Sequence, residues 1–104
     1  MEKLITKTEI LSKLKSNRQF LIGFGVKEIG LFGSFLTNNA NIDSDIDLLV
    51  DINKEHKTFK NFMSLNYFLE QLLNRKVDLV TKQSLSPYIG PHILSSVEYV
   101  PFSS

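Results

Sequence analysis

The chain has 104 residues, and we expect them to form one small domain over residues 1–104 with no room for a second. A formal net charge of +1 excludes the strongly basic surface of a nucleic-acid-binding protein, so no direct contact with nucleic acid is expected. The absence of cysteine excludes disulfides and zinc–thiolate sites. The sequence contains no run of about 18 apolar residues, which a membrane span would need. A cytoplasmic location without membrane contact is therefore expected.

The first third of the chain predicts a helix followed by a strand. Thr6 and Glu9 form a capping-box pattern, and apolar residues at helical spacing predict a helix that runs to about residue 22. Glycines follow and end this helix. Residues 26–32 are then typical of a strand, which leads directly into Gly33 and Ser34.

The Gly33-Ser34 pair is the first feature that indicates a ligand. A strand that ends in glycine and continues into one turn of helix lets backbone N–H groups approach an anion closely. The serine hydroxyl adds one more donor to such a turn. Taken alone, a Gly-Ser pair is usually only a bend, so the prediction depends on the acidic residues that follow.

A second strand is predicted over residues 45–51. Alternation along a strand sends Asp45 and Asp47 out of the same face, about 7 Å apart. The apolar run that follows indicates a central strand buried on both faces. Two like charges this close destabilise a strand unless a cation lies between them, and the cation we expect is Mg²⁺.

The rest of the chain predicts alternating helices and strands. A broad apolar stripe predicts a helix over residues 58–74, and residues 76–80 form a third short strand that directs Asp78 to the face of the earlier acids. Short helical turns are expected between residues 84 and 94, and residues 97–102 are ambiguous. This alternation predicts an α/β (α+β) fold, a small β-sheet with helices packed on it.

Two other ligand-binding motifs fail on this sequence. Asp43, Asp45 and Asp47 match the first three ligand positions of an EF-hand calcium loop. The glycine of that loop is replaced by Leu48 and its final glutamate by Lys54. A Walker phosphate loop is also excluded, because no Gly-Lys-Ser/Thr follows a glycine-rich stretch. We expect Asp43 to cap the turn before the second strand.

Together these segments resemble the minimal nucleotidyltransferase family of the polymerase-beta-like nucleotidyltransferase superfamily. Its signature of Gly-Ser, ten residues and Asp-x-Asp matches Gly33-Ser34, residues 35–44 and Asp45-Ile46-Asp47. Residues 44–50, 77–81 and 85–89 also look like family segments in the family order. The resemblance implies the nucleotidyltransferase fold, a small mixed β-sheet with helices packed on it, which binds a nucleoside triphosphate and Mg²⁺.

The resemblance also implies roles for single residues. Asp45, Asp47 and Asp78 would be the catalytic residues and hold the metal, with Asp78 helping to activate the acceptor hydroxyl, and Gly33 with Ser34 would bind the nucleotide. Family members commonly read Ala-Arg-Gly shortly after the Gly-Ser pair, where this chain has Leu36, Thr37 and Asn38. The guanidinium that would bind phosphate through its planar fork is therefore missing.

Stand-alone family members of this size resemble antitoxins that pair with a HEPN-domain ribonuclease toxin. The leading hypothesis is therefore a protein adenylyltransferase that transfers AMP from ATP to a tyrosine hydroxyl of its toxin. The alternative is a non-catalytic antitoxin that neutralises the toxin by direct binding. Transfer to a small molecule such as an aminoglycoside is a third idea, disfavoured because so small a domain offers little wall for a second pocket. The sequence leaves open whether the chain forms a hetero-oligomer or a homodimer.

Overall fold

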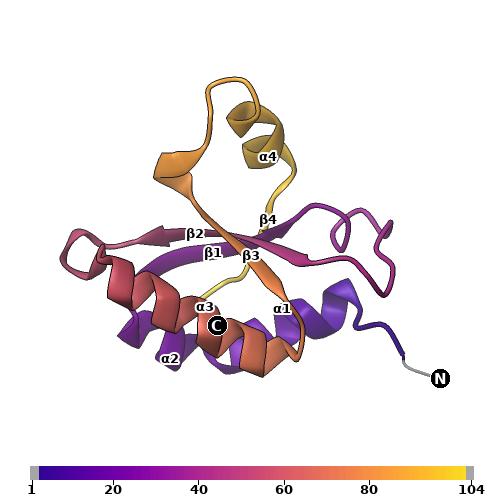
Figure 1. Cartoon of the computed structure of the whole chain (residues 1–104), viewed down its shortest axis with the longest axis horizontal. Coiled ribbons are helices and arrows are strands. Elements are labelled where there is room, and N and C mark those ends of the chain that lie inside the picture. Colours follow the sequence, from indigo (N-terminus) through magenta and orange to yellow (C-terminus); the bar gives the residue numbers. More distant parts are fainter. Residues whose placement is uncertain (1–2, 103–104) are drawn as a thin grey trace.

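A computed structural model describes residues 3–102, which form a four-stranded sheet with helices on both of its faces (Figure 1). In chain order the elements are α1 (Lys7–Ser16), α2 (Arg18–Gly23), β1 (Val26–Phe32), β2 (Ile46–Ile52), η1 (Lys54–His56), α3 (Phe59–Leu73), β3 (Val77–Thr81), η2 (Lys82–Ser84), α4 (Gly90–Ser96) and β4 (Glu98–Tyr99). This architecture confirms the predicted α/β fold. No helix within the described range is both long and apolar enough to cross a membrane.

The N-terminal helical region is two helices, and the prediction of one continuous helix to about residue 22 was wrong. The capping box is present, because the Thr6 side chain accepts from the Glu9 N–H and the Glu9 carboxylate accepts from the Thr6 N–H. Asn17 then leaves helical geometry, with φ −110° and ψ 20°, and its side-chain amide donates to the Lys13 carbonyl. Asparagine interrupts helices in this way because its side chain competes for backbone hydrogen bonds.

The sheet has the order β3-β2-β1-β4 and is mixed. The β1–β2 and β1–β4 pairs are antiparallel, whereas β2 and β3 run parallel. A parallel pair needs a crossover, and α3 supplies it between β2 and β3. β2 is therefore a central strand, and its residues Leu48, Leu49 and Val50 are fully buried, as their apolar run predicted.

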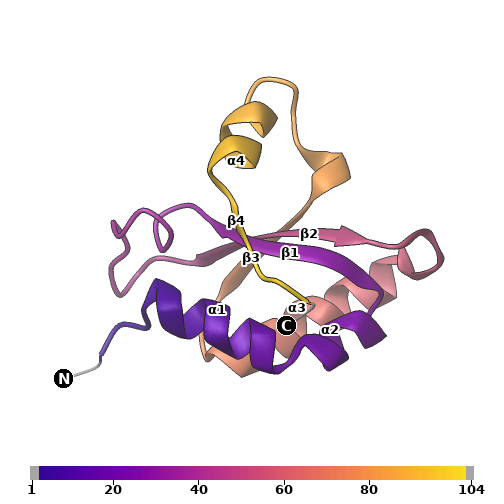
Figure 2. The same cartoon turned by 180° about the vertical axis from the view of Figure 1, so that it is seen from behind.

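One face of the sheet carries the main hydrophobic core under α1, α2 and α3, which lie together on that side in both views (Figures 1 and 2). The predicted apolar stripe on α3 is confirmed in part. Leu65, Leu69 and Leu73 are buried, but Phe59 and Met63 are exposed. Alternation along β2 directs Leu48 and its even-numbered neighbours to this core and leaves the odd-numbered residues for the opposite face.

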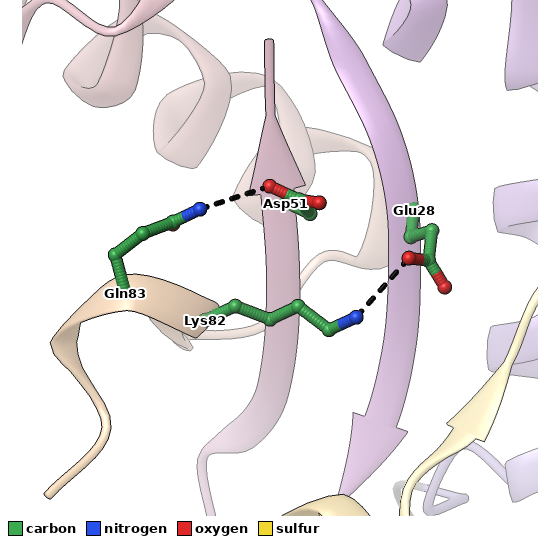
Figure 3. Close-up of polar contacts among 4 residues, drawn as sticks. All are labelled: Glu28, Asp51, Lys82 and Gln83. Carbon is green, nitrogen blue, oxygen red and sulfur yellow. Dashed lines mark hydrogen bonds and ion pairs between the residues drawn. The ribbon is translucent and has the colours of Figure 1, made fainter. Parts of the chain in front are cut away.

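The opposite face is covered only in part, by the segment that contains η2 and α4 (Figures 1 and 2). Two side-chain contacts hold the start of this segment on the sheet (Figure 3). Lys82 Nζ lies 3.1 Å from Glu28 Oε1 of β1, and Gln83 Nε2 lies 3.1 Å from Asp51 Oδ1 of β2. The short helices η2 and α4 confirm the predicted helical turns of this region. The ambiguous residues 97–102 contain the short strand β4.

Candidate functional site

Two of the predicted acidic residues lie directly beside each other on the less covered face of the sheet. Asp47 of β2 is in parallel register with Asp78 of β3, so the two side chains project to the same side. This confirms the prediction that Asp78 shares the face of the earlier acids. Strand β2 begins at Ile46, one residue later than predicted, so Asp45 lies just before the strand. Asp47 and Asp45 are half-buried, and Asp78 is exposed.

Gly33 lies against the Asp47 carboxylate. It follows β1, has φ +76°, and a Cβ built on it would stand 2.2 Å from Asp47 Oδ2. Any side chain at this position would displace the carboxylate, and an L-residue would also be strained at this φ. Position 33 therefore requires glycine for two separate reasons. The Gly33 turn also lies in direct contact with the Asp47 side chain.

The acids are electrostatically coupled. Burial first, then the charges of Asp78 and Asp45, and a hydrogen bond with Asp78 raise the pKa of Asp47 from 3.8 to about 6. A hydrogen bond between two carboxyl groups requires a proton on one of them. Below about pH 6 a proton on Asp47 therefore reduces the repulsion that a cation would otherwise offset.

The turn after Gly33 resembles the first turn of a helix. The Gly33 carbonyl accepts from the N–H groups of Leu36 and Thr37, both at 3.1 Å, and the Ser34 carbonyl accepts from the Asn39 N–H at 2.9 Å. N–H groups at the start of such a turn have no partner four residues earlier and can bind an anion. Thr37 cannot replace the missing arginine, because its hydroxyl donates to the Gly33 carbonyl at 3.3 Å.

The loop between this turn and Asp45 is closed by its own polar residues. The Asn41 side chain accepts from the Asp43 N–H at 2.8 Å, and Ser44 Oγ accepts from the Asn41 N–H at 2.9 Å. Asn41 and Ser44 therefore cap this turn, and the prediction that Asp43 does so was wrong. A side chain such as that of Asn41 makes an Asx turn two residues along the chain, which Asp43 would have to make with Asp45.

Arg75 is a residue near the site that the sequence reasoning missed. It precedes β3 and donates to carbonyls of the 41–44 loop. The only sequence signal was its place three residues before Asp78. Its contacts span more than 30 residues of chain, and no local pattern predicts a contact of that range.

The donor atoms fit a hard divalent cation. Within residues 3–102, no three acidic or histidine side chains are already gathered closely enough to hold a metal ion. Mg²⁺ does not require such a cage, because it is usually bound through one or two carboxylates together with phosphate oxygens and water. Asp47 and Asp78 supply two carboxylates in register, and Gly33 lies against the Asp47 carboxylate.

Comparisons with known proteins identify the family and the fold of the chain. The model of the nucleotidyltransferase domain family matches residues 8–100. The protein adenylyltransferase MntA of Thermococcus cleftensis is 43% identical over 98 residues, which cover 93% of this chain and 98% of the relative. A solved structure provisionally assigned as a minimal nucleotidyltransferase has a TM-score of 0.80 at 25% identity, covering 93% of this chain and 98% of its own.

The fold also recurs in a toxin–antitoxin complex. In the complex of tri-AMPylated Shewanella oneidensis HEPN toxin with MNT antitoxin, the matching chain has a TM-score of 0.56 and 21% identity. The match covers 86% of this chain and 72% of that one. At this level of identity the likeness shows the shared fold.

Proposed function

The chain belongs to the nucleotidyltransferase domain family, and we propose that it is a Mg²⁺-dependent protein adenylyltransferase that acts as an antitoxin. In this proposal it transfers AMP from ATP to a tyrosine hydroxyl of a cognate HEPN-domain toxin. The similarity to a protein adenylyltransferase over nearly the whole chain supports the activity. The fold shared with the antitoxin of an AMPylated HEPN toxin complex supports the partner.

The observation that carries the proposal is the meeting of Asp47, Asp78 and Gly33 at one point of the sheet. Nucleotidyl transfer needs little covalent help from protein, because positioning and charge stabilisation do most of the work. An acid pair beside a phosphate-binding turn supplies both. The raised pKa of Asp47 supports the proposal, because burial and the neighbouring carboxylates make ionisation of Asp47 unfavourable and a bound cation would offset that cost.

The proposed roles follow from these positions. Asp45, Asp47 and Asp78 would hold Mg²⁺, which when bound neutralises phosphate charge and favours the departure of pyrophosphate. The Gly33-Ser34 turn would bind the triphosphate. Asp78, the exposed acid, would accept the proton of the tyrosine hydroxyl. The tyrosine oxygen then forms a bond to the α-phosphorus, the bond from that phosphorus to the β-phosphate oxygen breaks, and pyrophosphate leaves.

A matched pair of glycine variants tests this proposal. Purified chain, HEPN partner, Mg²⁺ and α-labelled ATP should give labelled partner, and Gly33→Ala should lower the transfer rate at least about 100-fold by displacing Asp47. Gly23→Ala is the control, because a Cβ at Gly23 meets nothing within 4 Å, and its rate should match the wild type. Wild-type chain that labels no partner with any divalent ion would refute the catalytic proposal.

The non-catalytic antitoxin remains the second candidate, favoured by the side chains after the Gly-Ser pair. Leu36, Thr37 and Asn38 provide no guanidinium, and the Thr37 hydroxyl is engaged by its own turn. The two candidates differ in stoichiometry. An enzyme neutralises an excess of toxin when ATP is present, whereas a binding antitoxin needs an equimolar amount and tolerates Gly33→Ala if the variant folds.

A further inference from the structure

Arg75 joins the segment before β3 to two segments that lie more than 30 residues earlier in the chain. Its Nε donates to the Ser44 carbonyl at 2.9 Å, and its Nη2 donates to the Asn41 carbonyl at 2.9 Å and to the Ile42 carbonyl. Its Cζ also lies 5.3 Å from the centre of the Phe35 ring. One guanidinium, carried on the segment that enters β3, therefore contacts both the loop before Asp45 and the turn after Gly33.

Each of these contacts is adjacent to one part of the candidate site. Phe35 follows Ser34 directly, and Ser44 immediately precedes Asp45. Arg75 itself stands three residues before Asp78, on the segment that enters β3. None of these contacts is with a side chain of the predicted site residues. The effect of Arg75 on the site must therefore pass through the backbone of the neighbouring residues.

Little else ties the 41–44 loop to the rest of the molecule. The Ile42 side chain at the loop tip is 70% exposed, so apolar packing does not hold it. The hydrogen bonds between Asn41 and Ser44 shape the loop but do not attach it to the sheet. The Ile46 N–H donates to the Lys76 carbonyl at 3.0 Å. This hydrogen bond holds the chain at Ile46, which follows Asp45, and not within the loop.

We propose that Arg75 is a positioning residue that fixes the 41–44 loop and the Gly33-Ser34 turn relative to β3, and so sets where Asp45 stands against Asp47 and Asp78. Its catalytic consequence rests on the proposed adenylyl transfer, whereas its structural consequence does not. A planar guanidinium is suited to this role because it donates in several fixed directions at once and stacks on an aromatic ring. A lysine offers one ammonium and cannot serve three carbonyls and a ring in the same way.

Hydrogen exchange tests the structural step without any assay of activity. In Arg75→Ala, the amides of Asn41, Asp43 and Ser44 should exchange at least about tenfold faster, while core strand amides keep their protection. Arg75→Lys should show a smaller effect. The control is Arg18→Ala, the other arginine of the chain, which donates to the Lys15 carbonyl at 3.0 Å far from the loop in sequence.

Kinetics at a temperature where every variant is folded tests the catalytic step. Arg75→Ala should lower kcat by about 10- to 100-fold with a smaller change in the KM for ATP, and added guanidinium ion should restore part of the loss. Unchanged loop exchange in a folded Arg75→Ala, or faster exchange spread evenly over the chain, would overturn the proposal. Absence of transfer by the wild type would refute the proposed function, and the exchange data would still decide the role of Arg75.

Discussion

At the scale of single residues, ionised Asp47 destabilises the folded protein in the absence of a ligand. Burial, and then the charges of its neighbours, raise its pKa to about 6, so ionising it near neutral pH costs free energy in the folded state. The unfolded chain does not bear this cost. Such residues are typical of sites where a ligand supplies the missing charge. The same cost makes a direct prediction for a substitution that removes the charge.

Asp47→Asn should stabilise the metal-free protein at about pH 8, by about 1 kcal/mol after allowance for solvent screening, and raise Tm by about 4–8 °C. Asparagine keeps the size of aspartate and cannot ionise. Because the folded pKa lies above the unfolded value of 3.8, the wild type is most stable below that value and loses stability as pH rises through about 6. The gain should therefore vanish near about pH 4.

Thermal unfolding in the presence of a chelator measures this effect at the two pH values. Asp43→Asn is the matched control, because Asp43 is exposed in the loop and its substitution should change Tm little at either pH. An equal gain for Asp47→Asn at both pH values would contradict the electrostatic explanation.

The sequence predicted part of the site at this scale. The two-residue period of the strands placed Asp47 and Asp78 on one face, and their register confirms this. Whether the Gly33-Ser34 turn binds phosphate stays a prediction, although its contact with Asp47 is consistent with it. Arg75 was not predictable, because its hydrogen bonds depend on how two distant segments meet.

At the scale of elements, the end of α3 determines how the chain enters β3. Asn74 follows the helix in the left-handed region, with φ 51° and ψ 44°, and its N–H donates to the Glu70 carbonyl. Glycine is the usual residue in this position, and asparagine is the common substitute. The turn places Arg75 and then Asp78, so its geometry bears on both the loop and the acid pair.

Substitution of Asn74 should separate backbone strain from side-chain loss. Asn74→Ala should lower the free energy of unfolding by about 1 kcal/mol, because an alanine at positive φ is strained. Asn74→Gly should change it by no more than about 0.5 kcal/mol, because glycine adopts this conformation freely. Urea unfolding of both variants measures the difference, with Gln71→Ala on the exposed side of α3 as the control. Equal losses for alanine and glycine would show that the side chain, not the backbone, matters.

Helix boundaries were less predictable than strand faces. The break at Asn17 has no glycine or proline to mark it, and the apolar period continues into Leu21 of α2. The interruption is seen only in the structure, in the backbone angles of Asn17 and in the hydrogen bond from its side chain to the Lys13 carbonyl. In the strands, in contrast, side chains alternate between the two faces at every residue, so the sequence repeats the same pattern along the whole strand.

At the scale of the whole molecule, the site exists only when the sheet has formed. The Gly33-Ser34 turn follows β1, Asp47 lies in β2 and Asp78 lies in β3, so no single segment contains it. The antiparallel β1–β2 pairing and the parallel β2–β3 pairing must both be in register. A ligand that contacts all three segments therefore binds the folded state alone, and binding should stabilise the entire fold.

Mg²⁺ with a non-hydrolysable ATP analogue should raise the Tm of the wild type. At about 100 times the dissociation constant the stabilisation is about 2.7 kcal/mol, which for a domain of this size corresponds to a Tm rise of about 10 °C or more. The rise should shrink below about pH 6, because Asp47 is then protonated and the cation must displace that proton. Differential scanning fluorimetry of the ligand series measures it, with the analogue plus chelator and Mg²⁺ alone as controls.

The Asp47→Asn variant should respond much less, despite its higher starting Tm. A full response in that variant, or in the presence of chelator, would contradict a cation held by these acids.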